Sequence, residues 1–184
     1  PKKRDGLSIS FKDRVYQRSI NDNVLYPEMT RHFIYDNWAC QTGKGPDKAR
    51  NRVKKMLRKY YVSHGTSEGW ILQTDVKGYY PNMSHAAVKN NFKEYLPKDV
   101  HEMICDVLDT QYKGETGYNP GSQMVQIAGI SLLDKTDHYI KEVLHQKYYL
   151  RYMDDSMMIA QTKEELESVL ENLERKMKEV GCIL

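Results

Sequence analysis

Cysteine is scarce in this sequence, and no long apolar run interrupts it. The three cysteines lie far apart and have no His or Cys neighbours at metal-ligand spacing, so they indicate neither a disulfide framework nor a zinc site. They are Cys40, Cys105 and Cys182. Hydrophobic residues make up 40% of the chain but never form the run of about 20 residues that a membrane helix needs. Residues 1–5 are basic without an apolar segment behind them, so no secretory signal is visible. We therefore expect reduced cysteines, a cytoplasmic location and no membrane partner.

Basic and acidic residues are distributed unevenly along the chain. Residues 1–70 contain 15 of the 28 lysines and arginines but only 7 of the 25 aspartates and glutamates. The remainder is therefore acidic, although the net charge of the whole chain is only +3. A basic N-terminal part suits contact with phosphates, and an acidic C-terminal part suits metal binding. A solvated basic face would give the same distribution, so charge alone does not decide between the two interpretations.

Two strand-like segments flank a pair of carboxylates near residue 154. Residues 148–153 and 156–160 are rich in aromatic residues, methionine and isoleucine, which predicts a β-hairpin with Asp154 and Asp155 at its tip. Tight hairpin turns favour Asn-Gly or Asp-Gly, so turn preference does not explain this pair. Adjacent carboxylates repel each other unless a cation or hydrogen-bond donors lie beside them, and Mg²⁺ is the simplest such partner. A solvated acidic turn is the alternative that this segment leaves open.

A second acidic strand end strengthens the metal interpretation. Residues 70–76 predict a largely apolar strand with Asp75 near its end. The strand-breaking residues Gly78 and Pro81 follow. A lone Asp at such a place is usually a cap or a turn former. If this strand lies beside the hairpin, however, Asp75 joins Asp154 and Asp155 at one edge of the sheet. Three carboxylates could there hold two metal ions about 4 Å apart, as in polymerases and nucleases.

The order and spacing of these motifs resemble those of reverse transcriptases. The segments that carry the resemblance are Tyr152-Met153-Asp154-Asp155, Asp75-Val76-Lys77-Gly78-Tyr79-Tyr80-Pro81 and the Gly121-containing segment between them. The resemblance covers nearly the whole chain, and the tetrad in this order is a specific motif. It implies an RNA-directed DNA polymerase of the α+β class. The implied architecture is a right-hand palm, with a ferredoxin-like antiparallel sheet and helices on one face, plus mainly helical fingers.

The resemblance also implies a domain organisation. Residues 1–69 would be the fingers and residues 70–184 the palm, with a helical insertion near the fingers around residues 84–120. A short strand is predicted at residues 7–11. Helices are predicted at about residues 12–26, 46–61, 84–96, 99–112, 122–144 and, behind a capping box, 163–180. In the family a primer grip and a thumb would follow, and neither is present here. We therefore expect a fingers and palm fragment that is weak or inactive by itself.

Catalytic roles follow from the same resemblance. Asp75 and Asp154 would be the main ligands of two Mg²⁺ ions, for which Mn²⁺ could substitute. The backbone carbonyl of Val76 would be a further ligand, and Asp155 a supporting carboxylate. Tyr80 falls where the family places the aromatic residue that excludes the 2′-hydroxyl of a ribonucleotide. A core aromatic is the alternative for Tyr80, because the chain has 14 tyrosines.

Further residues are predicted to contact the nucleotide or the nucleic acid. Free backbone N–H groups at a helix start attract anions, so the entrance to the helix at residue 122 could line a nucleotide pocket. The implied nucleotide-binding residues are Tyr80, Gly121, Gln126, Met153, Lys12 and Arg14. Basic residues that could grip phosphates are Arg18, Lys44, Lys48, Arg52, Lys55 and Lys59. Surface cations without a ligand are the alternative for this set.

The resemblance implies an RNA template, a DNA or RNA primer and deoxynucleoside triphosphates as partners, and a homodimer stays open. Pro120-Gly121-Ser122-Gln123 with Gln126 departs from the Pro-Gln-Gly of group II intron enzymes, including maturases, and looks closer to retron and diversity-generating enzymes. We expect a bacterial retroelement enzyme. The alternatives are another palm polymerase that copies RNA into RNA, a metal nuclease, or a nucleic-acid-binding domain with a degenerate palm. Tyr80 favours deoxynucleotides, and the intact acids count against a degenerate palm.

Overall fold

The structure is a computed structural model that describes residues 10–119 and 121–184. In chain order, with η for a π-helical turn, the elements are α1 (Phe11–Ile20), η1 (Asn21–Leu25), α2 (Tyr26–Thr30), α3 (Pro46–His64), β1 (Trp70–Thr74), α4 (Tyr79–Asn82), α5 (His85–Tyr95), α6 (Lys98–Gln111), α7 (Gln123–Leu132), α8 (Asp134–His138), η2 (Tyr139–Val143), β2 (Tyr149–Tyr152), β3 (Asp155–Ala160) and α9 (Lys163–Glu179). No helix within the described ranges is long and apolar enough to cross a membrane.

The chain divides into two compact units, each built from two separate stretches of sequence. One unit consists of Pro1–His32 and Gly78–Leu132, and the other of Phe33–Lys77 and Leu133–Leu184. The boundary between fingers and palm expected at residues 69 and 70 is a functional division, and it stays a prediction.

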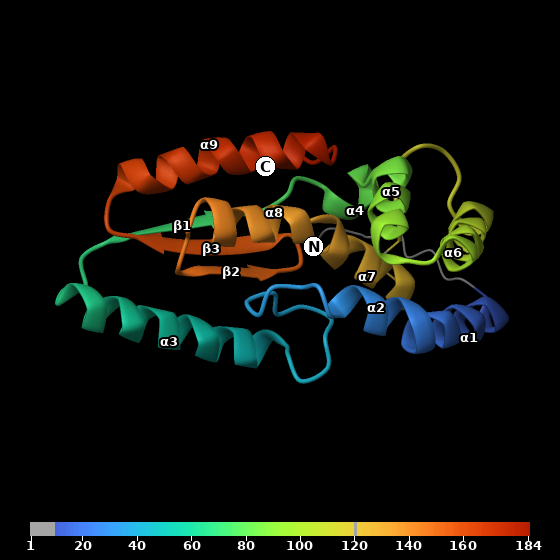
Figure 1. Cartoon of the computed structure of the whole chain (residues 1–184), viewed down its shortest axis with the longest axis horizontal. Coiled ribbons are helices and arrows are strands. Elements are labelled where there is room, and N and C mark those ends of the chain that lie inside the picture. Colours follow the sequence, from blue (N-terminus) through green and yellow to red (C-terminus); the bar gives the residue numbers. More distant parts are fainter. Residues whose placement is uncertain (1–9, 120) are drawn as a thin grey trace, which may run out of the picture. The chain divides into compact units, whose positions relative to one another are not determined.

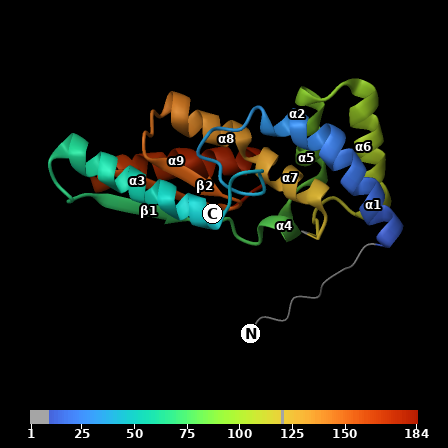
Figure 2. The same cartoon turned by 90° about the horizontal axis from the view of Figure 1, so that it is seen from below.

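A three-stranded antiparallel sheet forms the centre of the second unit. Its strand order is β1-β3-β2, so the predicted hairpin β2–β3 receives β1 on its β3 side (Figure 1). The register pairs Trp70 with Ala160 at one end of β1 and Thr74 with Ser156 at the other. Helices α8 and α9 lie on one face of the sheet, and α3 covers the opposite face (Figures 1 and 2). The mixture of helices with a small antiparallel sheet confirms the α+β class.

Helix α3 packs on the sheet through one apolar stripe. Ala49, Met56 and Tyr60 recur at helical spacing and are buried. They join a core cluster whose other buried members are Trp38, Tyr148, Leu150 and Ile159. Gly65 in the left-handed conformation ends the helix, so it runs three residues beyond the predicted end at residue 61. This packing fixes β2 and β3, and hence the hairpin, from one side.

Helix α9 begins where the capping box predicts. The Thr162 hydroxyl accepts a hydrogen bond from the Glu165 backbone N–H at 3.2 Å, which caps the first turn. The buried face of the helix consists of Leu166, Val169, Leu173 and Met177. These residues cover the sheet face opposite to α3.

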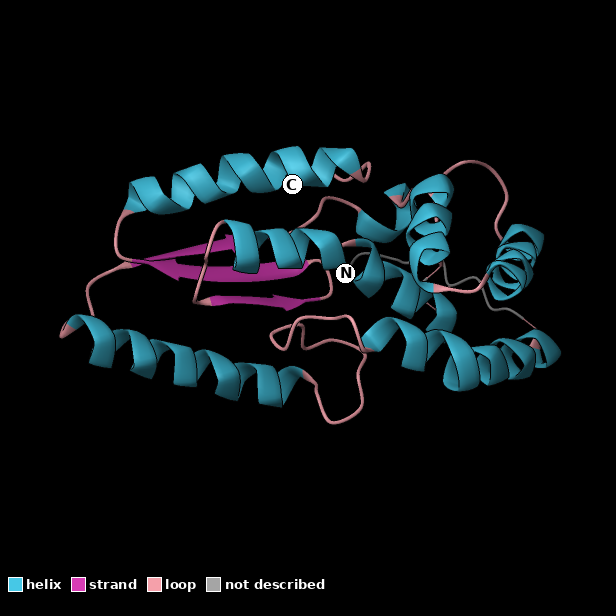
Figure 3. Cartoon of the chain, in the orientation of Figure 1, coloured by secondary structure: helices cyan, strands magenta, loops and turns pink. Residues whose placement is uncertain are grey.

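The described part of the first unit is mainly helical (Figure 3). Two predicted elements, one of which continues into the second unit, differ from the structure. The strand predicted at residues 7–11 lies largely outside the described residues, and Phe11 is instead the first residue of α1. The single helix predicted at residues 122–144 is interrupted at Leu133, whose φ of −96° and ψ of 3° leave the helical region. This interruption separates α7 from α8 and falls where the two units meet in the sequence. Ser84 caps α5, because its hydroxyl accepts a hydrogen bond from the Ala87 N–H at 3.3 Å.

Candidate active site

The hairpin turn consists of Met153 and Asp154. Tyr152 pairs directly with Asp155, so Asp155 is the first residue of β3 and the predicted tip at Asp154 and Asp155 is shifted by one residue. The backbone reason is Met153, whose φ of +57° supplies the left-handed conformation that a two-residue hairpin turn requires. For a residue other than glycine this conformation costs about 1–2 kcal/mol. Other contacts must therefore hold the turn in place.

Strand β1 brings Asp75 to the same end of the sheet. Thr74 lies opposite Ser156 on β3, and their hydroxyl groups are 2.7 Å apart. Asp75 follows Thr74 directly, just as Asp155 precedes Ser156, so the chain leaves β1 beside the hairpin turn. Asp75 and Asp155 are exposed, whereas Asp154 is half-buried. The sheet register thus places the three predicted acids together.

Burial and neighbouring negative charge raise the pKa values of two of the three acids, Asp154 and Asp155. Burial raises the pKa of Asp154 above its ordinary value, and the negative charges of Asp75 and Asp155 raise it further. Burial and the charge of Asp75 also raise the pKa of Asp155. Like charges at this spacing favour a proton or a cation between them. The acids therefore form one electrostatic site.

The donor set of this site fits a hard divalent cation, because carboxylate and carbonyl oxygens are the ligands that Mg²⁺ prefers. Val76, whose carbonyl is the predicted additional ligand, is buried directly after Asp75. In the described part of the chain, no group of three or more Asp, Glu, His or Cys side chains is already arranged to hold a metal ion. The backbone thus assembles the acids, and their side chains are not set in a closed coordination shell.

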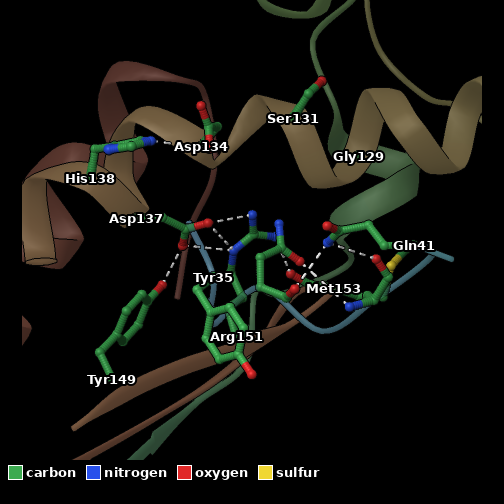
Figure 4. A network of polar contacts seen from close by, with 12 residues as sticks. Tyr35, Gln41, Gly129, Ser131, Asp134, Asp137, His138, Tyr149, Arg151 and Met153 are labelled. Atoms are coloured by element: carbon green, nitrogen blue, oxygen red, sulfur yellow. Dashed lines mark hydrogen bonds and ion pairs between the residues drawn. The ribbon is translucent and has the colours of Figure 1, made fainter. Parts of the chain in front are cut away.

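A buried ion pair lies directly behind the hairpin turn (Figure 4). The Arg151 guanidinium and the Asp137 carboxylate have side chains 1% and 0% exposed. The Arg151 Nε and Nη2 groups donate to Asp137 Oδ1 at 2.8 Å and Oδ2 at 2.7 Å. The Tyr149 hydroxyl donates to Asp137 Oδ1 at 2.6 Å. The remaining arm of the guanidinium, Nη1, donates to the Met153 carbonyl at 2.6 Å.

The sequence alone did not predict this cluster. The available signal was an arginine in the middle of a strand of buried residues, because a buried guanidinium must have a partner that balances its charge. The partner Asp137 lies in a different element, and its spacing from Arg151 follows no recognisable rule. Only the tertiary structure identifies the pair.

A separate pocket in the first unit brings together two of the predicted nucleotide-binding residues, Arg14 and Gly121, with Arg18 from the predicted nucleic-acid-binding set. Its volume is about 410 Å³, and it is lined by Phe11, Arg14, Val15, Gln17, Arg18, Gly121, Ser122 and Gln123. The Ser122 hydroxyl donates to Gln17 Oε1 at 2.5 Å, which ties the loop before α7 to α1. The pocket therefore unites Arg14, Arg18 and Gly121. Lys12 is exposed on α1 without lining the pocket, and Gln126 lies half-buried within α7.

A family model described as reverse transcriptase (RNA-dependent DNA polymerase) matches residues 4–184. The chain belongs to the reverse transcriptase family. No curated protein matches the sequence.

Solved structures similar to this chain include telomerases from two Candida species. Telomerase from Candida albicans, in complex with a TWJ fragment of telomeric RNA, gives a TM-score of 0.61 at 12% identity over 94% of this chain and 32% of its own. Apo telomerase from Candida tropicalis gives 0.60 at 14% identity, over 94% and 35%. The same protein truncated from its C-terminal domain gives 0.57 at 16% identity, over 91% and 36%. Identities this low show a shared fold alone, and the chain spans about a third of the length of these telomerases.

Tyr80 lies in α4 and is half-buried, whereas its neighbour Tyr79 is a core residue only 3% exposed. The Tyr79 hydroxyl donates to the Gly129 carbonyl at 2.5 Å. Tyr80 also packs against Gly129 of α7. Of the two tyrosines, the buried Tyr79 therefore fits the role of a core aromatic better. The remaining predicted nucleotide contact, Met153, belongs to the hairpin turn.

The six predicted nucleic-acid contacts fall into three groups. Lys44 and Arg52 are engaged within the second unit: Lys44 Nζ donates to the Asn37 carbonyl at 2.5 Å, and Arg52 Nε donates to Asp36 at 2.6 Å. Three lysines of α3 are exposed, namely Lys48, Lys55 and Lys59. Lys48 Nζ donates to the Gly43 carbonyl at 2.5 Å. The surface of α3 thus presents cations, while Lys44 and Arg52 stabilise the loop before it. Arg18, the sixth member, pairs with Asp22 beside the pocket.

Proposed function

We propose that this chain is the fingers and palm core of an RNA-directed DNA polymerase that adds deoxynucleotides to a primer 3′-hydroxyl. The observation that carries the proposal is the meeting of Asp75, Asp154 and Asp155 at one end of a sheet, in a member of the reverse transcriptase family. Acids from two strands separated by about eighty residues of sequence have no evident structural reason to crowd together. Crowded carboxylates at a sheet end suit a site that binds cations.

Asp75 and Asp154 would hold two divalent cations, Mg²⁺ or Mn²⁺, with the Val76 carbonyl as a further ligand and Asp155 as a supporting carboxylate. When bound, such ions lower the pKa of the attacking hydroxyl and neutralise charge on the phosphates. The role of the chain is to position these oxygens. The partial burial of Asp154 strengthens its interaction with a cation, because water screens the charge less there.

Binding of the nucleotide is assigned to the pocket of the first unit. Arg14 and Arg18 supply guanidinium groups that can bind phosphate oxygens in a bidentate manner. Gly121 allows close approach of the backbone, and α7 begins beside it, so free N–H groups add to the positive potential. Tyr80 would exclude the 2′-hydroxyl, and Gln126 and Met153 would contact the nucleotide. Exposed lysines of α3 would bind the RNA template or the primer through their phosphates.

The lineage that we propose is a bacterial retroelement enzyme of the group II intron, retron or diversity-generating type. Support comes from Gly121 followed by polar residues, with Gln126 in the next turn, which resembles the last two groups more than maturases. The likeness to Candida telomerases concerns the fold, and at 12–16% identity it does not assign the lineage. A cytoplasmic location belongs to the same proposal.

The test is the substitution Asp154→Asn in the full-length protein, assayed by Mg²⁺-dependent primer extension on RNA with deoxynucleotides. Because a metal ion contributes several kcal/mol to the transition state, we expect extension to fall by about a thousandfold or more. Asp106→Asn, the same change at an exposed site on α6, is the matched control and should retain activity. Near-normal extension by the Asp154 variant would refute the proposal. Wild-type extension with ribonucleotides alone would favour an RNA-templated RNA polymerase instead.

A further inference from the structure

Arg151 connects a buried carboxylate to the turn that carries Asp154 (Figure 4). Two of its nitrogen atoms bind Asp137, and the third, Nη1, donates to the Met153 carbonyl at 2.6 Å. That carbonyl belongs to the peptide group between Met153 and Asp154, which is planar. Fixing the carbonyl therefore also fixes the backbone nitrogen of Asp154.

The backbone of Arg151 is held on both sides. Arg151 lies opposite Ser156 in the β2–β3 ladder. On the other side its N–H donates to the Asp36 carbonyl at 3.0 Å, and its carbonyl accepts from the Trp38 N–H at 2.9 Å. Asp137 is also fixed, because it lies in α8 and its backbone N–H donates to the Leu133 carbonyl at 2.9 Å. These contacts hold the guanidinium in one position, and its hydrogen bond to the Met153 carbonyl holds the turn.

The turn needs such a restraint. Met153 is in the left-handed conformation, which a residue other than glycine adopts only when the surrounding structure determines it. A different conformation at Met153 would rotate the following peptide and move the Asp154 carboxylate away from the end of β1. The hydrogen bond from Arg151 opposes that rotation.

We propose that Arg151 is a positioning residue for metal binding: through the Met153 carbonyl it holds the hairpin turn so that the Asp154 carboxylate meets Asp75. The inference rests on the proposed function and adds to it a residue that itself touches neither metal nor nucleotide. Asp137 orients Arg151 in the same way that outer carboxylates orient metal-ligating side chains. Lysine cannot replace Arg151, because a single ammonium group lacks the planar fork that reaches both Asp137 and Met153 at once.

The experiment measures Mn²⁺ binding by electron paramagnetic resonance in the full-length protein, without substrates. Loss of an outer partner of a metal site typically weakens metal binding by about 10- to 100-fold, so we expect a weakening in this range for Arg151→Lys. The matched control is Tyr149→Phe, which removes one buried hydrogen bond from the same Asp137 and leaves the contact to Met153. We expect Tyr149→Phe to bind Mn²⁺ about as well as the wild type.

A second readout reports the turn directly. In protein labelled with ¹³C-methyl methionine, the Met153 methyl resonance should shift or broaden in Arg151→Lys without metal, and it should stay in place in Tyr149→Phe. The Met124 methyl resonance, from α7, should not change in either variant. An unchanged Met153 resonance together with Mn²⁺ binding like that of Tyr149→Phe would overturn the proposal for Arg151.

The outcomes separate this inference from the proposed function. If the wild type and Asp154→Asn bind Mn²⁺ equally, the acids are not the metal site and the proposed function fails. If Asp154→Asn loses binding while Arg151→Lys retains it, only the role of Arg151 fails. Should Arg151→Lys not fold, the triple variant Asp137→Leu, Tyr149→Phe, Arg151→Met takes its place, because replacing a whole buried ionic cluster by apolar residues preserves folding better than breaking it. This folded variant should also lose Mn²⁺ binding, and retained binding would contradict the proposal.

Discussion

Tyr80 and Gly129 pack so closely that a side chain at position 129 would collide with the tyrosine. A Cβ atom on Gly129 would lie 3.1 Å from the Tyr80 hydroxyl oxygen and 3.4 Å from two carbon atoms of the ring. Gly129 is a helical residue of α7, so it makes room for Tyr80 by lacking a side chain and not by adopting unusual backbone angles. The glycine provides the surface on which the proposed sugar-selecting residue rests.

Gly129→Ala should displace Tyr80. Because the hydroxyl must move by a few tenths of an ångström, we expect overpacking to cost about 1 kcal/mol of folding free energy and to alter the choice between ribo- and deoxynucleotides. A double-mutant cycle with Tyr80→Phe measures this, since phenylalanine lacks the oxygen that lies nearest. The effect of Gly129→Ala should shrink in the Tyr80→Phe background. Equal effects in both backgrounds would show that the contact does not limit the position of Tyr80.

Tyr80→Ala should weaken discrimination against ribonucleotides. Removing the ring opens space for a 2′-hydroxyl, so we expect incorporation of ribonucleotides relative to deoxynucleotides to rise by about tenfold or more. The ratio of kcat/KM values for the two nucleotide types on one primer–template measures the change. Tyr79→Phe is the matched control, because it removes only a hydroxyl that donates to the Gly129 carbonyl. Unchanged sugar selectivity in Tyr80→Ala would remove this residue from the sugar-selecting role.

Lys55→Ala with Lys59→Ala should weaken nucleic-acid binding. Both lysines are exposed on α3, so their loss should reduce affinity for a primer–template without unfolding the protein. Each lost phosphate contact lowers the slope of log affinity against log salt by about 1, so the slope should fall by about 2. Fluorescence anisotropy across a salt series measures both quantities. The pair Lys163→Ala and Lys178→Ala on α9 controls for net charge, and an equal effect there would speak against a specific role for α3.

Asp36→Asn should destabilise the protein in a pH-dependent manner. Burial would raise the pKa of Asp36, but hydrogen bonds and charges from Arg52 and Lys141 lower it below the ordinary 3.8. Because the pKa of Asp36 is lowered in the folded state, the ionised carboxylate with Arg52 and Lys141 stabilises the fold above pH 3.8. This contribution disappears as the pH falls through the folded-state pKa of Asp36. We therefore expect a loss of about 3 kcal/mol at pH 7 and a smaller loss near pH 3, measured by urea unfolding.

Asp47→Asn serves as the control for that measurement. Its ion pair with Arg50 is largely exposed, so little effect is expected at either pH. An equal destabilisation by Asp36→Asn at both pH values would show that the charge of Asp36 is not the cause.

Local features of the fold follow the sequence closely. The stripe of Ala49, Met56 and Tyr60 predicts which face of α3 is buried, and the hydroxyls of Ser84 and Thr162 cap helices where expected. These features depend on neighbours within one or two turns. The prediction of one continuous helix at residues 122–144 is wrong, because this stretch does not depend on local sequence alone. Packing overrides helical propensity at Leu133, and α7 ends before it.

By itself, the sequence determined the two acidic strand ends, their order and the family that carries them. The pattern of apolar residues also predicted which segments are strands, because the spacing of apolar side chains along a segment indicates which of them are buried. Only the tertiary structure decided that β1 pairs with β3, that the turn is formed by Met153 and Asp154, and that Arg151 pairs with Asp137. Burial can be read from a residue and its neighbours, whereas the partner of a buried charge depends on where distant segments meet.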